Sequence, residues 1–155
     1  MTKASGLRIV VVDASLASMW VLREPYSSHA LALAGEWAGA GFEVIAPGLM
    51  LVEVTSALYK RVRRGEIDLN AALEALDVVL GFGVRIESES GLHRRALALA
   101  HLLNRPTPYD AQYLALAEMR GCEVWTGDER LYNSVRLELP WVRWIGAYNP
   151  TSEKD

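Results

Sequence analysis

The sequence predicts an α/β fold with a mostly parallel sheet that helices cover on both faces. Short apolar runs rich in β-branched residues alternate with longer helical stretches along the whole chain. The first run, 7–12, is continuously apolar rather than alternating, which is typical of a strand buried on both faces of a parallel sheet. Because one or two helices separate successive runs, the connections must be crossovers, and crossovers favour parallel pairing.

The remaining elements follow in order along the chain. Further strands are predicted over 42–46, 84–86, 122–125 and 141–145, and helices over 16–22, 26–40, 47–64, 68–80, 90–103, 107–120 and 128–135. The helix over 47–64 begins with Pro47 and stops at Gly65, the expected asymmetry of helix ends. Thr107 and Asp110 have capping-box spacing at the start of the helix over 107–120, with Asp in place of the usual Glu.

Length and composition limit the function classes. The chain has 155 residues, 51% of them hydrophobic and 23% charged, which fits one packed domain over 1–150 and a disordered tail over 151–155. The net charge of -3 gives no overall basic excess, so any nucleic-acid contact must come from a local patch. The single cysteine, Cys122, excludes an internal disulfide and a Cys-based zinc site. No uncharged apolar run approaches the ~18 residues of a membrane span, so we expect a soluble cytoplasmic protein.

Four acidic residues stand where a carboxylate serves either as a helix cap or as part of a site. Asp13 directly follows the first predicted strand, and Asp128 follows the fourth after a Thr-Gly turn. Asp13 or Ser15 could cap the next helix, and Asp128 could cap its own. Asp110 opens the helix over 107–120. Glu53 is the hardest to explain, because it lies in a helix that is apolar on nearly all sides, where an ionised Glu is costly unless it is paired or bound to a metal.

In a parallel α/β fold the loops at the carboxyl ends of the strands build the site. We therefore expect the four acids to converge at one end of the sheet. Carboxylates packed together repel strongly at low dielectric, and a divalent cation is the simplest compensation. Ligation by carboxylate oxygens alone suits Mg²⁺ or Mn²⁺ rather than zinc. Such sites typically carry out chemistry on phosphate esters.

Four segments in order resemble the PIN domain family, most closely the VapC toxins of type II toxin–antitoxin modules. They are Val-Val-Asp-Ala-Ser around Asp13, 47–58 around Glu53, 108–117 around Asp110 and 126–131 around Asp128, with successive acids 40, 57 and 18 positions apart. The resemblance covers residues 8 to about 147. It implies a three-layer α/β/α sandwich with a central, mostly parallel sheet of about five strands.

The same resemblance implies a function. Members of the family are metal-dependent endoribonucleases that use one or two Mg²⁺ or Mn²⁺ ions, are usually homodimers, and are inhibited by a small antitoxin protein. Asp13, Glu53, Asp110 and Asp128 match the family's acidic quartet of catalytic and metal-binding residues, and Thr126 matches a hydroxyl residue beside it. Two alternatives stay open: a catalytically silent binding module of the same fold, and a solitary housekeeping nuclease.

Positive charge near the acids is the requirement for RNA binding. Arg130 follows Asp128 by two residues and is the best phosphate contact, while Lys60 and Arg61 lie at the end of the Glu53 helix, where cations also complement the helix dipole. Five apolar residues early in the chain are candidates for a dimer or antitoxin face, although core packing explains most of them: Met19, Trp20, Leu22, Tyr26 and Leu31. Other enzyme classes lack their motifs, because the chain has no G-x-S-x-G and no H-E-x-x-H.

Overall fold

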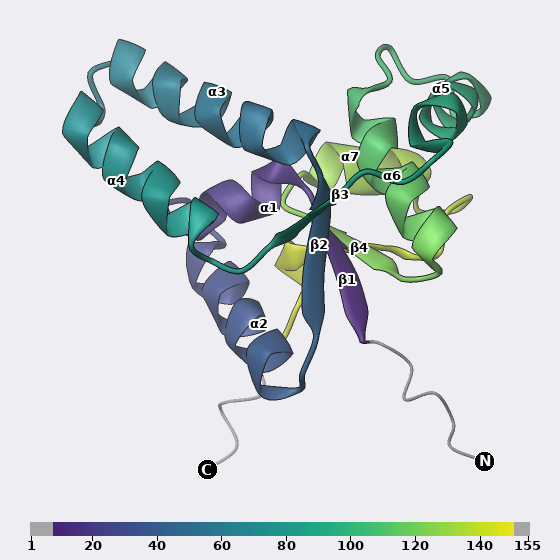
Figure 1. Cartoon of the computed structure of the whole chain (residues 1–155), viewed down its shortest axis with the longest axis horizontal. Coiled ribbons are helices and arrows are strands. Elements are labelled where there is room, and N and C mark those ends of the chain that lie inside the picture. The colour runs from purple at the N-terminus through teal and green to yellow at the C-terminus, as the bar shows by residue number, and fades with distance from the viewer. Residues whose placement is uncertain (1–7, 151–155) are drawn as a thin grey trace.

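The computed structural model describes residues 8–150, and within them it confirms the α/β prediction (Figure 1). Five strands form one sheet: β1 (Ile9–Val12), β2 (Glu43–Pro47), β3 (Arg85–Glu87), β4 (Glu123–Thr126) and β5 (Val142–Trp144). Their order is β3-β2-β1-β4-β5, and every neighbouring pair is parallel. The predicted tail over 151–155 lies outside the described residues.

Helices connect the strands and cover both faces of the sheet. Residues 8–150 form α1 (Ala14–Met19), α2 (Ser27–Gly39), α3 (Leu49–Arg63), α4 (Leu69–Leu80), α5 (Leu92–Leu102), α6 (Tyr109–Arg120), α7 (Glu129–Val135) and the 3-10 helix η1 (Ile145–Ala147). Figure 1 shows α2 on one side of the sheet and α5 and α6 on the other. Trp37 of α2 packs edge-on against Trp125 of β4, while α6 packs against β1, β2 and β4. The predicted three-layer sandwich is therefore confirmed.

The centre of the core is β1. Val10, Val11 and Val12 are all buried, as their continuous apolar pattern predicts for a strand with helices on both faces. Val11 is paired with Ile45 of β2 on one side and Val124 of β4 on the other. Asp13 directly follows this strand, so its backbone position is fixed by the most buried part of the molecule. No helix among residues 8–150 combines the length and apolar character that crossing a bilayer demands.

The helix that carries Glu53 is less buried than its sequence predicts. Only Met50, Val54 and Leu58 of α3 are buried, and Val52 is 64% exposed. These three residues form one i, i+4 stripe, and the apolar residues on the other faces are not covered by the sheet. Instead α3 pairs with α4, and the two helices extend beyond the sheet as a hairpin (Figure 1). The prediction of a helix buried on most faces is wrong.

Pro47 ends a strand rather than starting a helix. It pairs with Glu87 of β3 as the last residue of β2, and α3 begins two residues later at Leu49. β1 is paired with β2 only as far as Ile45, so at Pro47 the sheet has a neighbour on one side only. A residue without an N–H is tolerated at such a strand end.

Candidate functional site

Asp13 is held at the carboxyl end of β1 by three hydrogen-bond donors. It is the N-cap of α1, as predicted: Oδ1 accepts from the Leu16 amide at 2.9 Å and from Ser15 Oγ at 2.6 Å, and Oδ2 accepts from Thr126 Oγ1. The residue is only 5% exposed. Burial is the largest cause of its raised pKa, and the charge of Asp110 acts in the same direction. These hydrogen bonds lower the pKa, and the net result is a value of about 6. Asp13 is thus a buried carboxylate that ionises near neutral pH.

Thr126 connects the loops that follow β1 and β4. Its hydroxyl donates to Asp13, lies 3.2 Å from Ser15 Oγ, and accepts from the Asp128 amide at 2.9 Å. Ser15 Oγ in turn accepts from the Gly127 amide at 2.9 Å. Sequence reasoning placed Thr126 beside the acids but considered Ser15 only as a cap. The Asp-x-Ser spacing after the strand was the signal that could have identified its role.

Gly127 is required by the close approach of these loops. A Cβ at this position would lie 2.6 Å from Met19 Cε and 3.1 Å from the carbonyl oxygen of Ser15. A side chain here would displace the end of the Met19 side chain and press on the Ser15 backbone of α1. The glycine of the Thr-Gly-Asp turn keeps Asp13 and Asp128 on neighbouring loops.

Glu53 has a partner that the sequence analysis did not find. Its carboxylate accepts a hydrogen bond from the hydroxyl of Tyr113, a buried residue of α6. Burial, the hydrogen bond to Glu53 and the charges of Glu53 and Asp13 all raise the Tyr113 pKa, so the phenol stays protonated and acts as the donor. Tyr113 lies three positions after Asp110, on the same face of the helix. That i, i+3 spacing was the available signal.

Asp110 is not part of a capping box, contrary to the prediction. The N-cap of α6 is Pro108, which makes no side-chain cap hydrogen bond, so Thr107 lies before the helix rather than at its cap. Asp110 Oδ2 instead accepts from Arg105 Nη2 at 3.2 Å, and Arg105 Nη1 donates to Ser134 Oγ at 2.9 Å. Arg105, on the loop before α6, therefore orients Asp110.

Asp128 lies at the rim of the site. It is the N-cap of α7, as predicted, and Oδ1 accepts from the amides of Arg130 at 2.9 Å and Leu131 at 3.2 Å. Asp128 and Arg130 line an open hollow of about 520 Å³ together with residues of α1 and α3. Both side chains are exposed there. A cap and a solvent-facing carboxylate are compatible roles for one residue.

The predicted cations differ in their availability. Arg130 and Lys60 are exposed, and neither forms an ion pair within residues 8–150. Arg61 is half-buried and pairs with Glu24 at 3.1 Å and Glu66 at 3.2 Å. Arg130 is therefore free to contact a ligand beside Asp128, whereas Arg61 is already neutralised.

The five early apolar residues fall into two groups. Met19, Trp20 and Leu22 are buried in the core, so ordinary packing explains them. Tyr26 is half-buried, and Leu31 is exposed on α2.

The four predicted acids all lie at the carboxyl side of the sheet, but they are not gathered into one cage. Asp13 follows β1, Glu53 lies on the helix after β2, Asp128 follows β4, and Asp110 is in the first turn of α6. Thr126 links Asp13 to the Asp128 loop, and the Asp110 charge acts on Asp13. Between residues 8 and 150, no three His, Cys, Asp or Glu side chains are close enough together to hold a metal ion.

The donor set nevertheless fits a hard divalent cation. Mg²⁺ is usually bound by only one or two carboxylates and keeps several waters, so three protein ligands are not required. Asp13 is a buried carboxylate whose ionisation is disfavoured by burial and by Asp110, and a bound cation offsets both effects. Asp13 and Asp110 are the two acids whose charges interact in this way.

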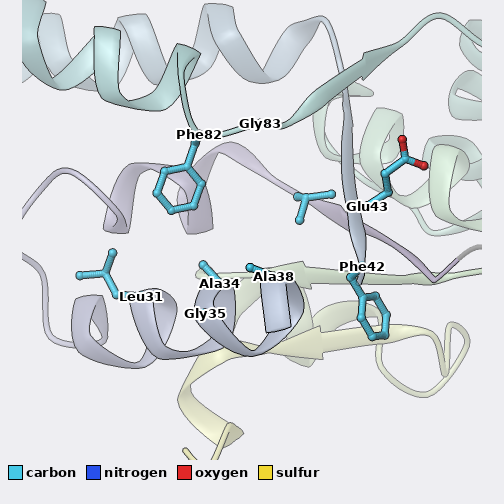
Figure 2. Close-up of a pocket in the computed structure, with 9 residues that line it drawn as sticks. Leu31, Ala34, Gly35, Ala38, Phe42, Glu43, Phe82 and Gly83 are labelled. Atoms are coloured by element: carbon cyan, nitrogen blue, oxygen red, sulfur yellow. The ribbon is translucent and has the colours of Figure 1, made fainter. Parts of the chain in front are cut away.

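The hollow shown in Figure 2 is at the other end of the sheet. It has a volume of about 400 Å³ and lies between α2, the start of β2 and the Phe82-Gly83 turn. Glu43, the first residue of β2, marks its position at the amino ends of the strands. Figure 2 shows Phe82 above Leu31 and Ala34 of α2. This hollow is separate from the four acids.

Comparison with known proteins agrees with this geometry. The sequence model of the PIN domain matches residues 10–136, which include all four acids. Among solved structures, the chain is similar to PAE2754 from Pyrobaculum aerophilum, with a TM-score of 0.65 and 23% identity over 88% of this chain and 90% of that one. It is also similar to Mycobacterium tuberculosis VapC20, described as a sarcin-ricin loop cleaving toxin, with a TM-score of 0.59 and 20% identity over 84% and 95% of the two chains. No curated protein sequence matches it.

The two kinds of comparison support different conclusions. The structural neighbours share the fold, at identities too low to carry over a substrate or partner. The sequence match spans the sheet from β1 to β4 and ends just beyond α7. With the acids in order and the five-stranded parallel sheet in place, the chain belongs to the PIN domain family.

Proposed function

We propose that the protein is a metal-dependent endoribonuclease that hydrolyses RNA phosphodiesters, and that it is the toxin of a toxin–antitoxin pair. The observation that carries the proposal is Asp13, a buried carboxylate fixed by Ser15, Leu16 and Thr126 at the end of the central strand. PIN domains are generally nucleases, and RNA is favoured as substrate by the neighbour described as cleaving the sarcin-ricin loop.

Each acid has a separate role in this proposal. Asp13 and Asp110 hold Mg²⁺ or Mn²⁺, Glu53 assists as a third ligand or through water, and Asp128 completes the pocket from its rim. When bound, the cation supplies positive charge to the scissile phosphate and activates water for attack. The chain's own contribution is orientation: Thr126 and Ser15 fix Asp13, Tyr113 fixes Glu53, and Arg105 fixes Asp110. Arg130 and Lys60 provide the exposed cations for RNA phosphates.

A surface away from the acids is available to protein partners. The groove between α3 and α4 is lined by apolar side chains of both helices, including Tyr59, Leu69 and Leu73, each more than half exposed. Exposed apolar residues grouped in this way mark interaction surfaces. Their presence supports the proposals of a homodimer and a small antitoxin partner, since either would cover them.

The test of the nuclease is RNA cleavage with Mg²⁺ or Mn²⁺, with and without EDTA. We expect cleavage by the wild type that EDTA abolishes, at least a hundredfold loss in Asp13→Asn, and wild-type rates in Glu66→Gln, a matched control at an exposed acid. Equal cleavage by Asp13→Asn and wild type would reject the scheme. The silent binding module instead predicts neither cleavage nor a shift in melting temperature when Mn²⁺ is added.

The toxin role needs a separate experiment. Expression of the wild type in a bacterial host should arrest growth, while expression of Asp13→Asn should not. Co-expression of a small open reading frame encoded beside the gene should restore growth. A solitary housekeeping nuclease predicts cleavage in vitro without growth arrest.

A further inference from the structure

A second hollow adjoins the candidate site on the β3 side of the sheet. Its volume is about 430 Å³, within the range of roughly 300–1,000 Å³ that is typical of ligand pockets. The end of β2, the loop after β3, and the first turns of α5 and α6 form its walls. Figure 1 shows these elements around the carboxyl ends of β2 and β3, at the same side of the sheet as the acids.

Helix α6 joins this hollow to the proposed catalytic residues. Tyr109 and Gln112 line the hollow, while Asp110 and Tyr113 on the same turns interact with Asp13 and Glu53. A ligand in the hollow would therefore lie next to the point where we propose that RNA is cut. The Gln112 side chain is held by His93 of α5, with Oε1 lying 3.0 Å from Nδ1, which fixes one wall.

The walls suit a flat aromatic ligand. The ring of Tyr109 is 57% exposed, and Ile86 beside it is 41% exposed. Tyr109 makes no aromatic contact or hydrogen bond through its side chain within residues 8–150. Bases stack on aromatic side chains in single-stranded nucleic-acid complexes, and every base can do so because each has a π-face. An exposed tyrosine beside a nuclease site offers that interaction.

The charges of the lining disfavour phosphate and favour hydrogen-bond donors. No described residue that lines the hollow is Lys or Arg. Its two carboxylates differ: Glu87 pairs with Arg85 and with Arg120, whereas the Glu89 side chain has no ion-pair or hydrogen-bond partner within residues 8–150. An unpaired carboxylate repels a phosphate and accepts from an exocyclic amino group, as Glu does from cytosine N4.

From these observations we infer that the hollow is a subsite for an unpaired nucleobase bearing an exocyclic amino group, which stacks on Tyr109 and donates to Glu89. The inference rests on the proposed ribonuclease function, because it assigns the hollow to the same substrate. It makes Tyr109 and Glu89 specificity determinants, whereas the four acids act on the phosphate.

The experiment compares two matched probes, fluorescently labelled 12-mers of oligo(C) and oligo(U), whose bases differ by an amino or an oxo group at position 4. Binding is measured by anisotropy in EDTA, where no cleavage is expected. We expect the wild type to bind oligo(C) about fivefold more tightly than oligo(U), a ratio typical of one net hydrogen bond. Glu89→Gln should bring the two affinities together.

Tyrosine variants test the stacking. Tyr109→Ala should weaken binding of both probes about tenfold, Tyr109→Phe should bind like the wild type, and Leu97→Ala, which removes a similarly exposed large apolar side chain on α5, should have no effect. A wild type that does not distinguish the two probes overturns the inference, as does a Tyr109→Ala variant that binds like Leu97→Ala. The melting temperature of each variant checks that it is folded.

The same protein separates this inference from the proposed function. If the wild type distinguishes the probes through Tyr109 and Glu89 but cleaves no RNA with Mn²⁺, the subsite stands and the nuclease proposal fails. If it cleaves RNA but the variants leave both affinities unchanged, the nuclease stands and the subsite fails.

Discussion

The hydroxyl of Thr126, at the end of β4, donates a hydrogen bond to Oδ2 of Asp13, at the end of β1. The two residues are 113 positions apart in the chain, but their strands are adjacent in the sheet. The same hydroxyl oxygen accepts from the Asp128 amide. One small side chain therefore holds the buried acid and the rim acid in fixed relation.

The first prediction concerns a variant that lacks the Thr126 hydroxyl. Thr126→Val keeps the shape of the buried side chain but removes the donor to Oδ2 of Asp13 and the acceptor of the Asp128 amide, while Oδ1 of Asp13 keeps its bonds to Ser15 and Leu16. We expect a loss of about 1–3 kcal/mol in unfolding free energy by urea titration, the usual cost of unsatisfied buried groups. The hydrogen bond lowers the pKa of Asp13, so its loss should move the acid limb of the cleavage pH profile upward. Thr126→Ser should restore both measurements, and a Ser variant as impaired as the Val variant would contradict the role.

The second prediction concerns stability and pH. In EDTA, the native state binds more protons than the unfolded state between the ordinary Asp pKa of 3.8 and the folded value of about 6. The contribution of Asp13 to stability therefore falls as pH rises through this window and is constant above it. A pKa displaced this far corresponds to about 3 kcal/mol.

The measurement is urea unfolding of the wild type and Asp13→Asn between pH 4 and pH 8. The difference between the two proteins isolates the Asp13 contribution, because the other titrating groups are shared. We expect the wild type to lose stability relative to Asp13→Asn up to about pH 6. Saturating Mn²⁺ should reverse that loss in the wild type only. Parallel curves for the two proteins in EDTA would show that Asp13 ionises as an ordinary surface acid.

The third prediction concerns the contact between α3 and α6. Tyr113→Phe removes the one hydrogen-bond donor that the half-buried Glu53 carboxylate has within residues 8–150. We expect a loss of about 1–2 kcal/mol in unfolding free energy at pH 7 and a lower cleavage rate. Tyr59→Phe, at an exposed tyrosine, is the matched control and should behave as the wild type. In the double variant Tyr113→Phe with Glu53→Gln the stability loss should be smaller than in the single variant, because the unpaired charge is gone.

The fourth prediction concerns the turn after β4. Gly127→Ala places a Cβ against Met19 and the Ser15 carbonyl oxygen. We expect a loss of about 1–3 kcal/mol in unfolding free energy, typical of overpacking. Gly127→Ala should cost less in a Met19→Ala background than in the wild type, since Met19→Ala removes the nearest obstructing atom, and a double-mutant cycle separates this coupling from the packing that Met19→Ala itself loses. A thermal melt of the single and double variants measures both effects, and an unchanged melt for Gly127→Ala would show that the loops are not tightly packed there.

Elements whose local sequence pattern agrees with their tertiary environment could be predicted from the sequence. The apolar run before Asp13 predicts the buried strand, and the residues after it predict the cap, because both depend on neighbours in the chain. The prediction that α3 is buried on most faces was wrong, because apolar residues outside the Met50–Val54–Leu58 stripe suggested burial. Composition reports the hydrophobicity of a helix, but not whether the rest of this chain covers it.

The contacts within the site were harder to predict, since they join distant segments. The Thr107–Asp110 spacing suggested a capping box. Because α6 begins at Tyr109, Thr107 is not at the cap position, and Asp110 pairs with Arg105 instead. The Tyr113 hydroxyl reaches Glu53 because α6 packs against β1 and β2, and α3 begins where β2 ends. Sequence spacing identified the acids, while the neutral groups that orient them became visible only in the folded structure.

Helix α3 is a rigid rod of about 22 Å, at 1.5 Å rise for each of its 15 residues. Glu53 is in its second turn, held by Tyr113, and the opposite end extends into the hairpin with α4. Glu53 and the projecting end belong to one uninterrupted helix, so a rigid-body tilt of α3 would move both. The orientation of the α3–α4 hairpin and the position of Glu53 beside Tyr113 therefore depend on each other.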